Sequence, residues 1–195
     1  MGCAVTVHHR IGQERLTAAI APQTSDAFHR LLESALGEAA HLSLGAEAVE
    51  VELTLCGDEE MTHLNFDHMG ERGPTDVLAF PLHEWSVDGG HSHLADEDAA
   101  SPPGSLLLGD VVIDVDQAMR QASQGGWSAV QEIALLAVHG ALHLVGHDHA
   151  ELDDEAAMRA IERRVLAILH RRHPEVGWRP GSLFDQPPHA VSAPA

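Results

Sequence analysis

The spacing of hydrophobic residues predicts three long helices in this chain. Apolar positions recur every three or four residues from Ala27 to Ala39, from about Ala129 to Val145, and from about Leu152 to His170. This spacing places one stripe of each helix against a core. Ser25 or Asp26 is expected to cap the first of these helices.

The helix at about 129–145 differs from the others because it is apolar on nearly all sides. Such a helix is expected to lie inside the core. Ser128 and Gln131 have the spacing of a capping box, which predicts the start of the helix. Gly146 can adopt the left-handed conformation that ends helices, and it therefore predicts where this helix stops.

Alternating or short apolar runs predict the strands. Residues 49–55 alternate between aliphatic and polar side chains, which predicts a strand with one wet face near a sheet edge. Strand character also appears at 4–8, 77–81 and 105–113. Strands and helices are mixed without regular βα alternation, so the predicted fold class is α+β, a small sheet surrounded by helices.

The chain is expected to form one domain over residues 1–173. Residues 83–104 are polar, acidic and marked by glycine and proline, which indicates a surface insertion, and residues 174–195 read as a flexible tail. No apolar run is long enough to span a bilayer, and the first residues enter strand character without a leader, so we expect a cytoplasmic protein without membrane contact. Cys3 and Cys56 are expected to be reduced thiols.

The charge balance limits the choice of partners. The chain has 30 acidic and 11 basic residues, all of them arginine, and a formal net charge of −19. Such a charge repels polyanions at long range and argues against nucleic-acid binding by the chain alone. Any RNA contact then needs a local patch, a metal ion or a partner that is already bound.

Three histidines carry the chemistry that the sequence predicts. His139 and His143 stand four residues apart and share one helix face, where two imidazoles can reach one zinc ion. Gly146 allows a sharp turn that brings His149 to the same ion. Three neutral imidazoles leave a fourth position for water, which is typical of catalytic zinc and indicates a hydrolase. The alternative, hydrogen-bonded core histidines, is weaker because a pair and a third residue after a glycine turn are present together.

The residues between and around these histidines narrow the chemistry. The spacing is that of metzincin proteases, but Gly140 stands where those enzymes need a glutamate base, so proteolysis is discounted. Asp148 is expected either to orient a ligand imidazole or to cap a helix. His147 is interpreted as solvent-facing, with a spare ligand or acid/base group as the alternative.

Several ordered blocks resemble the YbeY family, the metal-dependent rRNA-maturation endoribonucleases of bacteria. The blocks span about residues 50 to 170; they are Leu64-Asn65, Pro74 to Pro81, Leu108 to Ile113, His139 to His149, and Met158. The resemblance implies a small mixed sheet surrounded by helices in a zincin-like metal-hydrolase layout. It also implies zinc held by His139, His143 and His149.

The same resemblance implies single-strand-specific RNA cleavage in late 16S rRNA 3′ end maturation and in ribosome quality control. The expected partners are therefore rRNA and the ribosome or its proteins. One departure concerns phosphate binding, because Met69 stands where the family usually has an arginine near the metal. Arg72 is the candidate to replace that arginine.

Two alternatives stay open at the level of sequence. One is a metal-dependent hydrolase with a substrate other than RNA, which the acidic surface and Met69 favour. The other is a non-catalytic ribosome-associated factor whose zinc has a fourth protein ligand such as His147. Three imidazoles also accept nickel or iron in place of zinc.

Overall fold

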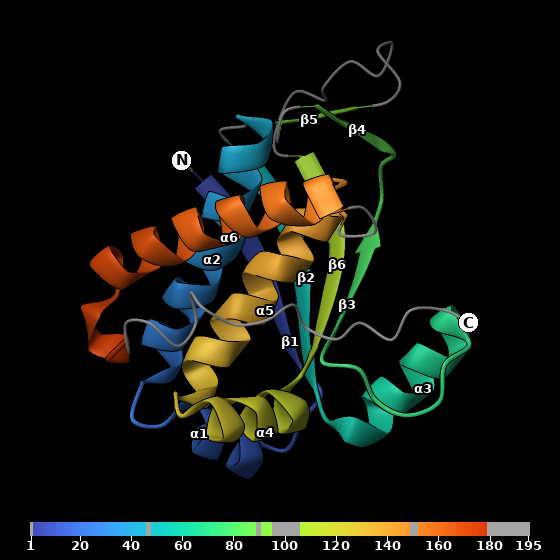
Figure 1. The fold of residues 1–195 in the computed structure, drawn as a ribbon. Helices are drawn as coiled ribbons and strands as arrows, with labels where there is room; N and C mark the ends of the chain where they lie inside the picture. Colours follow the sequence, from blue (N-terminus) through green and yellow to red (C-terminus); the bar gives the residue numbers. More distant parts are fainter. Residues whose placement is uncertain (1, 46–47, 89–90, 95–105, 149–151, 179–195) are drawn as a thin grey trace.

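A four-stranded mixed sheet forms the centre of the protein in a computed structural model that describes residues 2–45, 48–88, 91–94, 106–148 and 152–178. The strand order is β1-β2-β6-β3, in which β1 (Gly2–His9), β2 (Ala48–Cys56) and β6 (Leu106–Asp114) are parallel. β3 (Val77–Pro81) runs antiparallel to β6 at one edge (Figure 1). The predicted α+β class with a small mixed sheet is confirmed.

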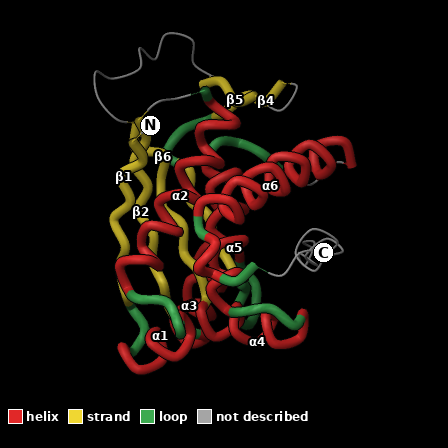
Figure 2. The backbone as a smooth tube through the Cα atoms, turned by 90° about the vertical axis from the view of Figure 1, so that its left-hand side faces the viewer, coloured by secondary structure: helices red, strands yellow, loops and turns green. Residues whose placement is uncertain are grey.

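Six α-helices surround this sheet within the described residues. They are α1 (Gln13–Ile20), α2 (Ser25–Leu44), α3 (Asp58–Met69), α4 (Val115–Gly125), α5 (Ala129–Leu144) and α6 (Leu152–Arg172). α2 and α5 lie against one face of the sheet and α6 packs on both of them (Figure 2). None of these helices combines the length and apolar character that crossing a membrane requires.

Strand alternation assigns the helices to opposite faces of the sheet. Val111 and Ile113 of β6 point into the large core that contains α2 and α5, whereas Val112 between them packs in a smaller cluster with Met61 of α3. Leu78 of β3 belongs to the same smaller cluster. α3 therefore covers the face opposite to α5.

The prediction that residues 49–55 lie near a sheet edge is wrong. β2 lies between β1 and β6, in the interior of the sheet. Its alternating burial is as expected, with Val51 and Leu53 buried and Glu50 exposed. Alternating apolar and polar residues indicate that one face of a strand is exposed to solvent. They do not indicate whether the strand has neighbours on both sides within the sheet.

The helix boundaries follow the predicted signals at α5 but not at α2. Ser128 Oγ accepts a hydrogen bond from Gln131 N at 3.3 Å, and Gln131 Oε1 accepts one from Ser128 N at 3.1 Å, so the capping box is confirmed. At α2 the cap is Thr24, whose Oγ1 accepts from Ala27 N at 3.3 Å. Ser25 and Asp26 are the first helical residues instead.

Ordered packing extends beyond residue 173, the expected end of the domain. A 3₁₀ helix, η1 (Pro174–Val176), follows α6 and buries Val176. Trp178 Nε1 donates to His173 O at 2.8 Å. Residues 179–195 of the expected tail lie outside the described residues. The expected insertion 83–104 contains a separate two-stranded sheet, β4 (Trp85–Asp88) and β5 (His91–Leu94), and its residues 89–90 and 95–104 are likewise outside.

Candidate metal centre

Two imidazoles face each other near the C-terminal end of α5. His139 Nε2 and His143 Nε2 are 3.0 Å apart, with ring centroids at 4.6 Å and an interplanar angle of 74°. The i,i+4 spacing thus brings the pair together as predicted. His149 lies outside the described residues, and its place as the third ligand stays a prediction.

A carboxylate from another helix holds one of these rings. Glu162 of α6 places Oε1 2.8 Å from His139 Nδ1, and the side chains are only 15% and 12% exposed. Arg159 on the same helix pairs with Glu155 and not with Glu162, with Arg159 Nη2 2.8 Å from Glu155 Oε1. A signal was present: Glu162 stands four residues after the buried Met158, on the inward side of α6.

This donor set fits a zinc ion. If Glu162 accepts a proton from His139 Nδ1, the other ring nitrogen of a neutral His139, Nε2, is left unprotonated on the side of His143 Nε2. Two neutral imidazole nitrogens with converging lone pairs are the ligands that Zn²⁺ prefers, at about 2.0–2.1 Å each. His139 and His143 would hold the ion, and the predicted His149 would complete the set.

The turn after α5 is fixed by its contacts with the core. Gly146 has φ +86°, and His147 N donates to Leu142 O at 3.0 Å. The side chain of His147 is 4% exposed, with Nε2 3.0 Å from Ser43 Oγ of α2. The expectation of a solvent-facing His147 is therefore wrong: the ring anchors the turn to α2. Asp148 is exposed, and its orienting role stays a prediction.

Replacement of Gly146 by alanine is expected to lower the free energy of unfolding by about 2 kcal/mol. An added Cβ would adopt a left-handed conformation and meet Trp85 Cβ of β4 at 2.4 Å. Gly126→Ala is the matched control, since Gly126 also ends a helix at φ +81° but its Cβ would meet no described atom within 4 Å. Urea unfolding of both variants measures the difference; equal losses would show that the contact with Trp85 is unimportant.

Close packing explains why no acid follows the first histidine. A Cβ on Gly140 would lie 2.7 Å from Val111 Cγ1 and 3.3 Å from Val77 Cγ2. α5 thus approaches β6 and β3 so closely that a glutamate at this position would enter the sheet. Both the residue type and this close packing therefore argue against a metzincin-type glutamate base at position 140.

The residues considered for phosphate binding lie on other elements. Met69, 53% exposed, ends α3 on the sheet face opposite to α5. Arg72 is exposed in the connection between α3 and β3. The structure does not bring Met69 to the histidine pair, and the assignment of Arg72 to the site stays a prediction.

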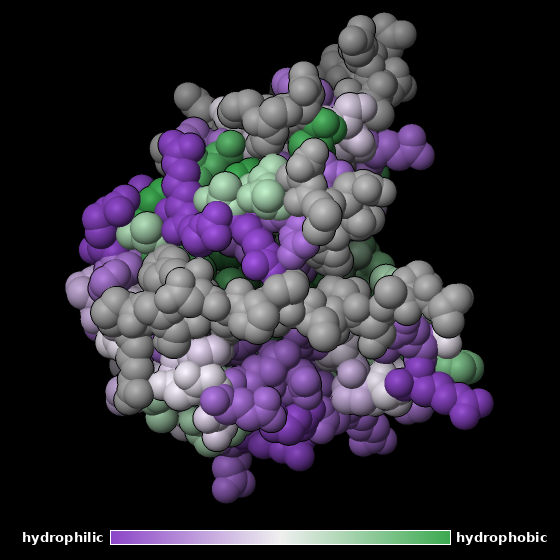
Figure 3. All heavy atoms as spheres, in the orientation of Figure 1, coloured by the Kyte–Doolittle hydropathy of each residue, from purple (hydrophilic) through white to green (hydrophobic). Residues whose placement is uncertain are grey.

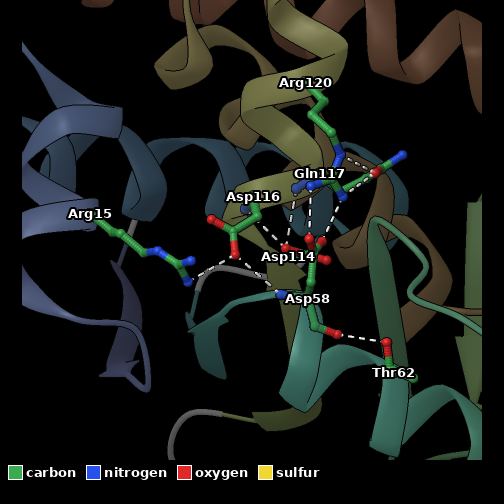
Figure 4. A network of polar contacts seen from close by, with 7 residues as sticks. All are labelled: Arg15, Asp58, Thr62, Asp114, Asp116, Gln117 and Arg120. Carbon is green, nitrogen blue, oxygen red and sulfur yellow. Dashed lines mark hydrogen bonds and ion pairs between the residues drawn. The ribbon is translucent and has the colours of Figure 1, made fainter.

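Within the described part of the chain, a second set of ligand-type atoms belongs to Asp58, Asp114 and Asp116, whose carboxylates lie within 4.8 Å of one another (Figure 4). Asp114 Oδ1 caps α4, accepting from Asp116 N at 2.9 Å and Gln117 N at 3.2 Å. Asp116 Oδ2 accepts from Asp58 N at 3.3 Å at the start of α3. The cluster is a joint cap of two helices, which the sequence analysis did not identify.

The surroundings of this aspartate cluster favour protonation of one carboxyl over the binding of a metal cation. Two helix N-termini direct positive ends toward it, and Arg15 and Arg120 bind Asp116 and Asp58. Burial, together with the nearby carboxylate of Asp58, raises the pKa of Asp114 to about 7, while the Arg120 guanidinium lowers the pKa of Asp58. The raised pKa favours the protonated form of Asp114, and the lowered pKa favours the ionised form of Asp58.

A mixed sheet next to a buried helix that presents two close imidazoles, one of them contacted by a carboxylate, is compatible with a metal-dependent hydrolase. Comparison with known proteins identifies the family. The family model described as Endoribonuclease YbeY matches residues 14–170, and the chain belongs to this family.

Individual relatives named Endoribonuclease YbeY are similar over most of the chain. The protein from Salinispora tropica is 45% identical over 121 residues, which cover 62% of this chain and 74% of the relative. The one from Desulfitobacterium hafniense is 42% identical over 139 residues, covering 71% and 83%. The one from Heliobacterium modesticaldum is 34% identical over 157 residues, covering 80% and 92%.

Proposed function

We propose that this chain is a zinc-dependent, single-strand-specific endoribonuclease that acts in late 16S rRNA 3′ end maturation and ribosome quality control. The observation that carries the proposal is the convergence of His139 Nε2 and His143 Nε2 at 3.0 Å in a chain of the YbeY family. The alternative of a substrate other than RNA is not favoured by the family. The alternative of a non-catalytic zinc factor loses support because His147 Nε2 faces Ser43 of α2.

Some residues of the site would bind the metal ion, and others orient those residues. A bound zinc ion would supply positive charge near the scissile phosphate and lower the pKa of water toward about 7. His139 and His143 would hold that ion, and Glu162 keeps the proton of His139 on the ring nitrogen that faces away from His143. His147 fixes the turn that leads from His143 to the expected third ligand.

Little of the RNA affinity comes from the charge of this chain. Hydrophilic side chains cover α4 and follow α6 on the face shown in Figure 3, but the formal net charge is −19. Arg163 and Arg164 of α6 are exposed, whereas Arg159 is paired with Glu155. We therefore assign most of the affinity to the metal ion and to the ribosome or its proteins.

Removal of the metal is expected to abolish cleavage of single-stranded RNA, and zinc to restore it. The test compares chelator-treated and zinc-reloaded protein on a single-stranded fragment from the 3′ end of 16S rRNA, with the same sequence as a duplex for control. Selective, zinc-dependent cleavage supports the proposal. Equal cleavage with and without metal, or none with zinc, nickel or iron, contradicts it. A cyclic phosphate at the product end would identify the RNA 2′-hydroxyl as the nucleophile.

A further inference from the structure

We infer that Glu162 is the positioning residue of the metal centre: it holds the Nδ1 proton of His139 and thereby directs the Nε2 lone pair to the metal. The inference rests on the proposed function in that it assigns the histidine pair to a metal. It goes further by naming a residue on a different helix whose effect passes through the ring of His139.

The position of Glu162 fits this role and excludes direct ligation in the arrangement observed. Its Oε1 contacts His139 Nδ1 at 2.8 Å, whereas His143 approaches the other ring nitrogen, Nε2, at 3.0 Å. The carboxylate and the second histidine therefore lie on opposite sides of one imidazole. Glu162 acts on the site from behind the ring.

A neutral imidazole carries one proton, and the nitrogen that carries it cannot bind a metal. In water the two tautomers exchange freely, so an unassisted His139 would spend much of its time with the proton on Nε2. A carboxylate accepts only the Nδ1 proton at this geometry, which selects the tautomer with a free Nε2. Carboxylate partners of this kind also make the ligand nitrogen more basic.

Packing fixes the carboxylate in place. Glu162 belongs to α6 between Met158 and Val165, which are 2% and 0% exposed in the core. α6 packs against α2 and α5, and His139 is part of α5. Because both partners are more than four-fifths buried, water competes weakly for the hydrogen bond.

The test uses Glu162→Gln and Glu162→Leu, with Glu155→Gln as the matched control. Glu155 is on the same helix and ion-paired to Arg159, so its replacement alters the charge of α6 by the same amount. Two quantities are measured: the protonated nitrogen of His139 in metal-free protein at pH 8, from imidazole ¹⁵N shifts, and the zinc affinity, from competition with a chromogenic chelator.

Wild-type protein is expected to carry the His139 proton on Nδ1. Glu162→Leu should lose this preference and bind zinc about 10- to 100-fold more weakly. Glu162→Gln should keep the tautomer, because an amide oxygen still accepts the proton, and should lose roughly tenfold or less. Glu155→Gln should match the wild type. Thermal unfolding of the metal-free variants separates loss of fold from loss of affinity, and Glu162→Gln, the closest isostere, serves if Glu162→Leu does not fold.

A wild-type His139 protonated on Nε2, or unchanged zinc affinity in a folded Glu162→Leu, would overturn the inference. A uniform loss of affinity that includes Glu155→Gln would also overturn it, since helix charge would then be the cause. Failure of the proposed function has a different signature: wild-type protein would bind zinc with the expected dependence on Glu162 and yet leave single-stranded rRNA intact.

Discussion

Replacement of His143 by alanine is expected to reduce RNA cleavage about a hundredfold or more, which corresponds to a loss of roughly 2.7 kcal/mol or more of the transition-state stabilisation that a bound metal would supply. The change removes one of two nitrogens that lie 3.0 Å apart and leaves His139 as the remaining candidate ligand of this pair. The fold should persist, because the flanking Leu142 and Leu144 carry the buried surface of this turn of α5. Cleavage of single-stranded rRNA under equal zinc and equal protein checks the expectation.

His29→Ala is the control variant, because it removes a histidine that lies outside the candidate metal centre. His29 is a half-buried residue of α2 whose ring centroid lies 5.5 Å from that of His9, so it also belongs to a histidine pair in a helix–strand contact. This variant should cleave like the wild type. Equal cleavage by His143→Ala would mean that a contaminating nuclease is measured. If the metal-loaded wild-type protein is inactive as well, the proposed nuclease activity is contradicted.

The helices and strands could be predicted largely from local patterns, because burial of one stripe or one face leaves its period in the sequence. The core helix α5 shows this most clearly, since its capping box and its glycine end are both encoded within a few residues of the boundary. The place of β2 in the sheet was not predictable in the same way. Its neighbours are β1 and β6, and strand pairing at such separations depends on the whole fold.

The histidine pair was predictable for the same reason, and its surroundings were not. His139 and His143 are one turn apart on one helix, so their proximity follows from helix geometry alone. Glu162 reaches His139 only because α6 packs on α5, and Ser43 reaches His147 across 104 positions of sequence. Partners that depend on how helices cross leave no periodic signal, which is why His147 was misplaced and the role of Glu162 was not predicted.

Replacement of Asp114 by asparagine is expected to make the protein more stable above pH 7 and to leave its stability unchanged near pH 4. Asp114 is fully buried, and burial with Asp58 alongside raises its pKa from an ordinary 3.8 to about 7. A carboxyl whose pKa is raised on folding binds a proton in the folded chain that the unfolded chain releases. The free energy of unfolding therefore falls as pH rises from about 4 to 7.

The size of the effect follows from the same shift. A rise from 3.8 to about 7 corresponds to a penalty of roughly 4 kcal/mol for the ionised residue above pH 7, as an upper bound. Asparagine avoids the penalty and keeps the geometry of the protonated acid. Its Oδ1 can accept from the N–H groups of Asp116 and Gln117, as Asp114 Oδ1 does at 2.9 and 3.2 Å. Its amide nitrogen can donate to Asp58.

The measurement is the difference in unfolding free energy between wild type and Asp114→Asn from pH 4 to 8, in chelator so that metal binding does not contribute. The difference isolates Asp114 from other groups that titrate in this range, among them Glu132, whose pKa burial also raises to about 7.

Asp116→Asn is the control, because it removes the partner of Arg15 without replacing the buried acid, and it should lower stability slightly. A difference for Asp114→Asn that stays constant with pH would show that Asp114 is ionised in the folded protein, and a cation at the three aspartates would then become the better explanation of the cluster.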